Sequence, residues 1–318
     1  RPINNSARSD ALLYAVALGG GTGNGSTPYI IDQFSQAPGG GRVPDTVDDP
    51  TWLGGIPQFV VAAWPFGGEG IQRYFNAVCG LSRLLMREDG SPNADMTILA
   101  SNAHLMGLAE ESDDAEQMSG RGPVSDEDLV NSKIISALDL FISAGRLADE
   151  TIDVRDYAQQ PQTRGAYHGT FGTELGKPIG LDIKVAIQNA ANNTFVPLDP
   201  STAEAAYVVV RAPEQQVRNG RITAGDVRSA VRDWKADQGL RATVGMQTLS
   251  KAPGGGNTFD VLVFFAGFDL DRLMEESETW DLFESELDRR RQNGSGERVQ
   301  RLDRINSNLR KYRSNLED

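Results

Sequence analysis

An apolar run followed at once by a glycine cluster constrains the fold of this chain more than any other feature. Residues 11–18 are apolar throughout and have the length of a buried strand. Glycine occupies five of the next seven positions, and Thr27-Pro28 is expected to open a helix that runs to about Phe34. Strand, glycine loop and helix in this order are typical of α/β proteins with a parallel sheet.

The remaining sequence alternates between short apolar runs and segments of helical periodicity. We expect strands at 58–64, 96–100, 206–211, 242–249 and 259–267, and helices at 70–86, 125–145 and 223–238. Ser125 is the expected N-cap of the long helix, and Gly145 its stop. An amphipathic helix is expected near the C-terminus, after a break at 293–296. Loops are expected at 36–55 and 109–125.

The glycine-rich segment 19–26 has the composition of a phosphate-binding turn. Glycines allow a tight turn that directs several backbone N–H groups to one point, and the following helix N-terminus adds partial positive charge. Thr22 and Ser26 add hydroxyl donors. Since no Lys or Arg lies nearby in the sequence, phosphate binding would depend on backbone amides and a metal ion.

Two common nucleotide motifs are excluded by spacing. A dinucleotide fold needs a third glycine or small apolar residue where this sequence has Asn24 or Ser26, and a P-loop needs a lysine after Gly25. A dehydrogenase also needs an acidic ribose partner at a suitable distance, and none is found. A plain glycine-rich hairpin loop stays open as the structural alternative.

Composition narrows the functional classes further. A net charge of -13 disfavours nucleic-acid binding through a general positive field. Lysine is scarce among the 31 basic residues, which favours an organism with a salty cytoplasm, where self-repulsion is screened. The single cysteine, Cys79, permits no intramolecular disulfide, and the two histidines lack a metal or triad motif. No transmembrane segment or signal peptide is expected.

Several motifs together resemble the tubulin/FtsZ superfamily. Residues 19–26 (Gly-Gly-Gly-Thr-Gly-Asn-Gly-Ser) are similar to its signature loop, with Asn24 in place of the usual Thr. Residues 60–70 resemble the FtsZ strand and loop that end in Pro-Phe-x-x-Glu-Gly, and 203–214 resemble the archaeal CetZ-like branch. The resemblance spans about 9–268 and omits the tail.

The resemblance implies a fold and a domain plan. The fold is α/β, with a Rossmann-like GTPase domain that is partial here, because about a hundred residues precede the signature strand in the family. Residues 1–124 would form the C-terminal portion of that domain, and 125–147 the central helix. Residues 148–270 would contain the catalytic segment and a smaller α+β domain, and 271–318 a charged helical tail. The chain begins without Met and resembles a fragment.

The resemblance also implies site residues and ligands. The expected ligand is GTP or GDP, which would enter with Mg²⁺; no metal site made by the protein alone is expected. The nucleotide would contact Gly19, Gly20, Gly21, Thr22, Gly23, Asn24, Gly25, Ser26, Glu69, Asn102 and Asn131. Glu127 stands where the family has an aromatic residue that stacks on the base. Glu150 and Asp153 match the acids that complete the active site of the neighbouring subunit, while the nearby family Asn is Ala148. At a helix N-terminus these acids would equally serve as favourable charges.

The implied function is that of a cytoskeletal protein that binds GTP and polymerises head to tail, with GTP hydrolysis completed at the subunit contact. Its place would be the archaeal cytoplasm, or through partners the inner membrane face or division site, in cell shape or division. The alternative is a tubulin-like structural or regulatory protein that binds other filaments without hydrolysing GTP. A dehydrogenase is the third and least favoured hypothesis.

Overall fold

The computed structural model describes residues 11–36, 56–66, 68–110, 125–144, 152–238, 240, 243–294 and 296–317. Its contacts divide the chain into two compact units. The first unit comprises 1–103, 161–169 and 269–318, and the second comprises 104–160 and 170–268. The C-terminal segment therefore belongs with the first unit, although it is last in the sequence.

The first unit is built on three parallel strands, β1 (Leu12–Ala17), β2 (Gln58–Trp64) and β3 (Met96–Ser101), in that order. Between them lie α1 (Thr22–Gln36) and α2 (Ile71–Leu85). The strands β2 and β3 are almost entirely buried, which explains their continuous apolar sequences. The predicted strands at 58–64 and 96–100 are thereby confirmed to within one residue.

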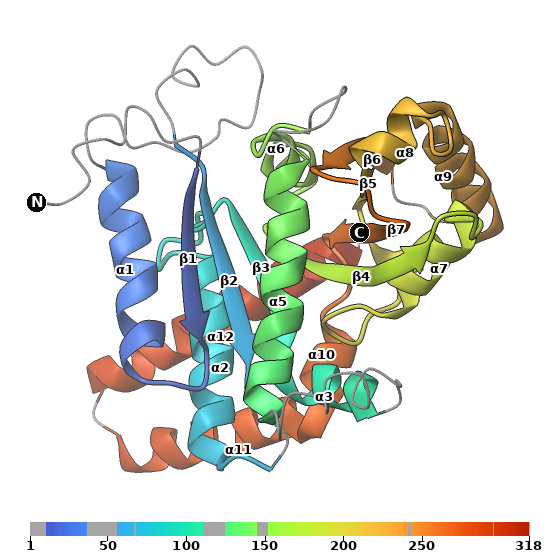
Figure 1. Cartoon of the computed structure of the whole chain (residues 1–318). Helices are drawn as coiled ribbons and strands as arrows, with labels where there is room; N and C mark the ends of the chain where they lie inside the picture. Colours follow the sequence, from blue (N-terminus) through green and yellow to red (C-terminus); the bar gives the residue numbers. More distant parts are fainter. Residues whose placement is uncertain are drawn as a thin grey trace, which may run out of the picture. The chain divides into compact units, whose positions relative to one another are not determined.

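The C-terminal helices complete the first unit. They are α10 (Asp271–Glu275), α11 (Thr279–Asn293) and α12 (Gly296–Glu317), with a short 3₁₀ turn at Glu276–Glu278 before α11. Both α11 and α12 pack on α2 (Figure 1). The break predicted at 293–296 is confirmed, since one helix ends at Asn293 and the next begins at Gly296.

Buried polar contacts fix α12 on this unit. The Tyr312 hydroxyl accepts from the Tyr167 N–H at 2.8 Å and meets His168 Nδ1 at 2.7 Å, and all three side chains are buried. Ser82 on α2 donates to the carbonyl of Ile305 on α12 at 2.7 Å. A buried polar group that loses its partner costs free energy, so these bonds specify how the helix docks.

The second unit contains the strands β4 (His168–Pro178, continuing from the first unit), β5 (Ala205–Pro213), β6 (Thr243–Ala252) and β7 (Thr258–Ala266), in the order β4-β7-β5-β6. Strand β5 is parallel to β6 and antiparallel to β7. The helices are α3 (Asn102–Glu110), α5 (Asp126–Ser143), α6 (Asp156–Gln162), α7 (Ile183–Asn192), α8 (Glu214–Arg218) and α9 (Ala224–Gln238), with a 3₁₀ turn at Pro200–Thr202. The first two residues of α3 and the last two of α6 belong to the first unit.

Helices cover both faces of the strands of the second unit. Phe264 of β7 contacts Phe141 of α5, whereas the adjacent Phe265 contacts Trp234 of α9. Because neighbouring strand residues point to opposite faces, α5 and α9 lie on opposite sides of the sheet. The sheet core is therefore aromatic on one face around Phe141, Tyr157, Phe171, Tyr207 and Phe264.

The local predictions have mixed outcomes. Ser125 is confirmed as the N-cap of α5, where its hydroxyl accepts from the Asp128 N–H at 3.2 Å, and the order of β5, α9, β6 and β7 is as expected. The predicted helix start at Thr27 is wrong, because α1 begins earlier, at Thr22. The β4 strand and α7 helix were not predicted. The expected helix stop at Gly145 lies outside the described residues.

Replacing Tyr312 by Phe should destabilise the protein by ~1–3 kcal/mol, because Tyr167 and His168 lose a buried hydrogen-bond partner. Urea unfolding followed by circular dichroism would measure the change. Tyr29 is 61% exposed, so Tyr29→Phe is the matched control and should change stability by less than about 0.5 kcal/mol. A Tyr312→Phe protein as stable as the unmodified one would contradict this account of how α12 docks.

Candidate functional site

The candidate site of the first unit lies at the carboxyl edge of its parallel strands. Ala17 at the end of β1 is opposite Ala63, and Trp64 at the end of β2 is opposite Ser101 at the end of β3. The segments that follow these strands therefore emerge at one edge of the sheet. They are the glycine turn, the loop that ends at Gly70, and the start of α3. Ligands of open α/β sheets bind at this edge.

The glycine turn is packed on one side and open on the other. The Gly20 N–H donates to the Ala17 carbonyl at 3.2 Å, which closes the turn directly after β1. A Cβ on Gly19 would lie 3.2 Å from Pro65 Cγ and 3.3 Å from Arg73 Cβ, so this glycine is needed for close packing. In contrast, a Cβ on Gly21 or Gly25 would meet no atom within 4 Å.

The open side of the turn consists of Gly21, Thr22, Gly25 and Ser26, all of which are exposed. Because α1 begins at Thr22, Gly21 directly precedes the helix and the other three residues lie in its first turns. The first backbone N–H groups of a helix lack helical partners. The Gly25 N–H already bonds the Gly21 carbonyl at 3.0 Å, and the Ser26 hydroxyl donates to the Thr22 carbonyl at 2.8 Å. The Thr22 end of the helix is thus the part that faces outward.

Two other predicted nucleotide ligands of this turn, Gly23 and Asn24, lie against the rest of the protein. Asn24 is buried, and its side-chain amide donates to the Asn76 carbonyl of α2. A Cβ on Gly80 would collide with the Asn24 side chain, so α1 and α2 meet at this pair. A Cβ on Gly23 would lie 3.1 Å from Val16. The structure therefore places the Asn24 side chain and the Cα of Gly23 against the protein and away from the exposed side.

A cation that the sequence analysis missed lies beside the turn. Arg73, in the first turn of α2, packs its side-chain stem against Gly19 and pairs with Glu69, with Nη1 3.1 Å from Oε1. Arg73 is distant from the turn in the sequence, but the start of α2 packs against Gly19, and the Asn76 side chain of α2 donates to the Gly19 carbonyl at 3.2 Å. The expectation that no basic residue lies near the turn is therefore wrong for the folded chain. Glu69, a predicted ligand, is the partner of this arginine.

A partly buried carboxyl group supports the end of β3. Glu276, from the turn before α11, accepts from the Ser101 hydroxyl at 2.6 Å, and burial raises the pKa of the Glu276 carboxyl above its usual value. Asn102 follows directly as the first residue of α3 and is half-buried. Glu276 was not predicted as part of this region, and no local motif in the charged tail distinguishes it from its acidic neighbours.

The remaining predicted residues belong to the second unit. Asn131 is exposed on α5, as is Glu127 one turn earlier. Asp153 is exposed, and its carboxylate accepts from the Arg155 N–H at 3.0 Å in the turn that leads into α6. Glu150, the other predicted catalytic acid, lies outside the described residues.

Neither a cluster of metal ligands nor a membrane-spanning helix is found among the described residues. Within this part of the chain, no group of three or more His, Cys, Asp or Glu side chains is arranged to hold a metal ion. Within the same residues, no helix has the length and apolar character needed to cross a membrane.

Comparison with known proteins gives structural neighbours only. No protein-family model matches the chain, and no curated protein does. CetZ from Methanosaeta thermophila is similar in structure, with a TM-score of 0.61 and 18% identity over 97% of this chain and 75% of that protein. CetZ2 from Haloferax volcanii, solved as a GTPγS-bound protofilament, has a TM-score of 0.61 and 18% identity over 88% of this chain and 72% of its own.

An FtsZ is also similar. The empty FtsZ dimer from M. jannaschii has a TM-score of 0.55 and 21% identity, over 81% of this chain and 63% of that one. This chain thus spans about two-thirds to three-quarters of the length of these neighbours. The chain has the α/β fold of the tubulin/FtsZ superfamily, with CetZ proteins among its structural neighbours.

Proposed function

We propose that this chain is part of a tubulin/FtsZ-like cytoskeletal protein that binds GTP or GDP at the turn between β1 and α1 and assembles with copies of itself. The observation that supports this most is the open side of that turn, at the carboxyl end of β1 and the N-terminus of a 15-residue helix. Backbone N–H groups and the helix dipole favour an anion there.

The residues at the turn fit a phosphate group. Gly21 and Gly25 leave open space in which phosphate oxygens can approach the backbone, and the exposed Thr22 hydroxyl can donate a hydrogen bond. Arg73 stands beside Gly19 and can turn its exposed guanidinium from Glu69 to a phosphate, since a surface ion pair of this kind is weak. Mg²⁺ bound with a nucleotide keeps several waters and needs few protein ligands, so it would enter together with the phosphates.

The neighbours support the choice of nucleotide and of self-assembly. CetZ2 from Haloferax volcanii is described as a GTPγS-bound protofilament, CetZ1 from the same organism as a GDP-bound monomer, and the M. jannaschii FtsZ as a dimer. By analogy, we propose guanine specificity, with Asn102 and Asn131 as contacts of the sugar and base, and head-to-tail filaments in the cytoplasm. A role in archaeal cell shape or division belongs to the same proposal.

The proposal extends to GTP hydrolysis at the contact between subunits. Glu150 and Asp153 of one subunit would orient the water that attacks the terminal phosphate held by the next. Phosphoryl transfer depends mainly on positioning and electrostatics, so one or two carboxylates are sufficient for this role. Asp153 is exposed and held by its bond to the Arg155 N–H, which suits a residue that acts on a neighbouring subunit.

A second candidate is a tubulin-like protein that binds related filaments without turnover. The exposed carboxylate of Glu127 favours it, because this residue stands where the family has a base-stacking aromatic. A carboxylate provides no stacking surface and repels an anionic ligand. Nucleotide turnover separates the two candidates.

Gly21→Ala should weaken nucleotide binding at least about tenfold, or ~1.4 kcal/mol, while the protein stays folded. The added methyl group meets no protein atom within 4 Å, so it occupies only the space into which we place the phosphates. Titration of a fluorescent GDP analogue would measure the affinity. Gly296→Ala, at another open glycine, is the matched control and should bind as the unmodified protein does. Equal affinity of the Gly21→Ala protein would exclude this turn as the phosphate site.

Asp153→Asn should lower GTP turnover in filaments about a hundredfold without weakening nucleotide binding. The amide oxygen can still accept from the Arg155 N–H, so the local turn is kept and only the charge is lost. Phosphate release and pelleting, both with GTP and Mg²⁺ at high KCl, would be measured in the intact protein, with Glu150→Ala beside it. Asp233→Asn, on the exposed side of α9, is the control. Unchanged turnover in both test variants would remove these acids from catalysis and favour the second candidate.

A further inference from the structure

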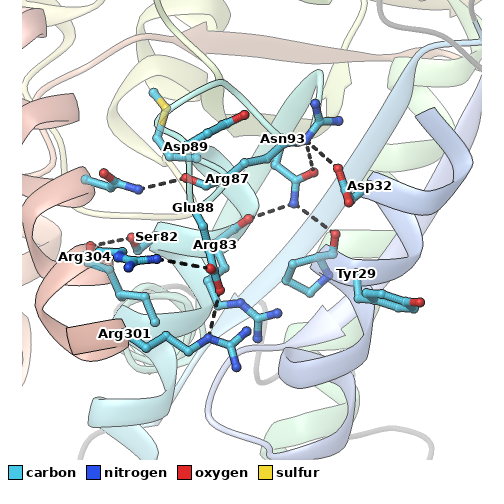
Figure 2. Close-up of a pocket in the computed structure, with 14 residues that line it drawn as sticks. Tyr29, Asp32, Ser82, Arg83, Arg87, Glu88, Asp89, Asn93, Arg301 and Arg304 are labelled. Carbon is cyan, nitrogen blue, oxygen red and sulfur yellow. Dashed lines mark hydrogen bonds and ion pairs between the residues drawn. The ribbon is translucent and has the colours of Figure 1, made fainter. Parts of the chain in front are cut away.

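A cavity of about 420 Å³ lies in the first unit, bordered by α1, the C-terminal end of α2 and α12 (Figure 2). The glycine turn adjoins the first turn of α2 through Arg73, whereas the cavity adjoins Arg83 and Arg87 at the other end. The helix between Arg73 and Arg83 rises by roughly 15 Å. The cavity is therefore distinct from the proposed nucleotide site.

Positive charge predominates in the lining of this cavity. Four arginines, Arg83, Arg87, Arg301 and Arg304, face three acids, Asp32, Glu88 and Asp89. The remaining lining includes the apolar atoms of Tyr29 and Met86. A surplus of cations is unusual in a chain whose net charge is -13, and like charges held close together raise the free energy of the empty site.

The acids do not neutralise all four arginines. Glu88 is shared, since Arg301 Nε lies 2.9 Å from one carboxylate oxygen and Arg304 Nη1 3.8 Å from the other, as Figure 2 shows. Arg87 pairs with Asp32 at 2.8 Å, but its Nη2 is buried and has no hydrogen-bond partner among the described residues. Asp89 accepts from the Ser91 N–H at 2.8 Å.

Arg83 is the least satisfied cation of the group. Among the described residues its guanidinium forms no ion pair or hydrogen bond, although the side chain is half-buried. Burial is the main cause that lowers the pKa of Arg83, and the nearby Arg301 lowers it further, whereas Glu88, which Arg301 and Arg304 already share, raises it. A guanidinium that is partly desolvated, beside a second one, is stabilised when an anion binds between them.

We propose that this cavity binds the phosphate group of a small phosphate monoester, with Arg83 and Arg301 as its principal ligands. A phosphate dianion accepts paired hydrogen bonds from guanidinium groups and offsets the repulsion between them. The cavity exceeds the size of a phosphate ion and lies within the range of small-molecule sites, and its apolar atoms can cover the organic part of the ligand. The exposed pairs of Arg301 and Arg304 with Glu88 are weak enough to rearrange.

Isothermal titration calorimetry of the intact chain, with and without GDP and at low chloride, tests the proposal with glycerol 3-phosphate and inorganic phosphate. Glycerol 3-phosphate should bind under both conditions, and Arg83→Gln should weaken it at least about tenfold. Arg232→Gln is the control, because Arg232 is an exposed arginine of α9 outside the cavity. Arg83→Gln should also leave thermal stability unchanged or raise it, because it removes a partly desolvated charge that Arg301 repels.

A vesicle arm distinguishes a free metabolite from a lipid headgroup. Binding to phosphatidic acid vesicles, but not to phosphatidylcholine vesicles, with the same loss in Arg83→Gln, would assign the phosphate monoester to a lipid. The proposal would be overturned if neither soluble phosphate binds and the vesicles do not bind either. It would also be overturned if the folded Arg83→Gln protein binds with the same affinity as the unmodified protein. Neither result would affect the nucleotide proposal, which is tested at Gly21.

Discussion

The parallel pairing of β1, β2 and β3 is the constraint on which the candidate site depends. The register brings the ends of all three strands to one edge, so the glycine turn, the loop after Trp64 and Asn102 become neighbours. The meeting of Asn24 with Gly80 then holds α1 close to α2, which places Arg73 against Gly19. A larger residue at position 80 would separate these helices and disturb the turn.

The parts of the fold that were predictable are those in which local sequence and tertiary environment agree. Strands β2 and β3 are buried on both faces, so their apolar runs alone define them. Ser125 caps α5 through a local side-chain bond, and Gly294 and Gly296 flank the break between α11 and α12, so both signals are contained in a few adjacent residues. The glycine turn was found for the same reason.

The parts that were missed depend on contacts between distant residues. Strand β4 contains three glycines and buried polar side chains, and Gly172 is required because a Cβ there would lie 2.1 Å from the Ala190 carbonyl oxygen of α7. Arg73, Glu276 and the early start of α1 were missed because their roles arise from packing across the unit. Among the predicted ligands, the inward direction of Asn24 follows from its bond to Asn76, which no local pattern indicates.

The central claim is that a nucleotide phosphate binds the backbone at the end of β1, and a crystal structure of the intact protein with GDP and Mg²⁺ tests it most directly. The diphosphate should lie beside the main chain of Gly20, Gly21 and Thr22, with the Arg73 guanidinium turned toward it. A diphosphate bound elsewhere, with this turn facing bulk solvent in a fully occupied complex, would contradict it.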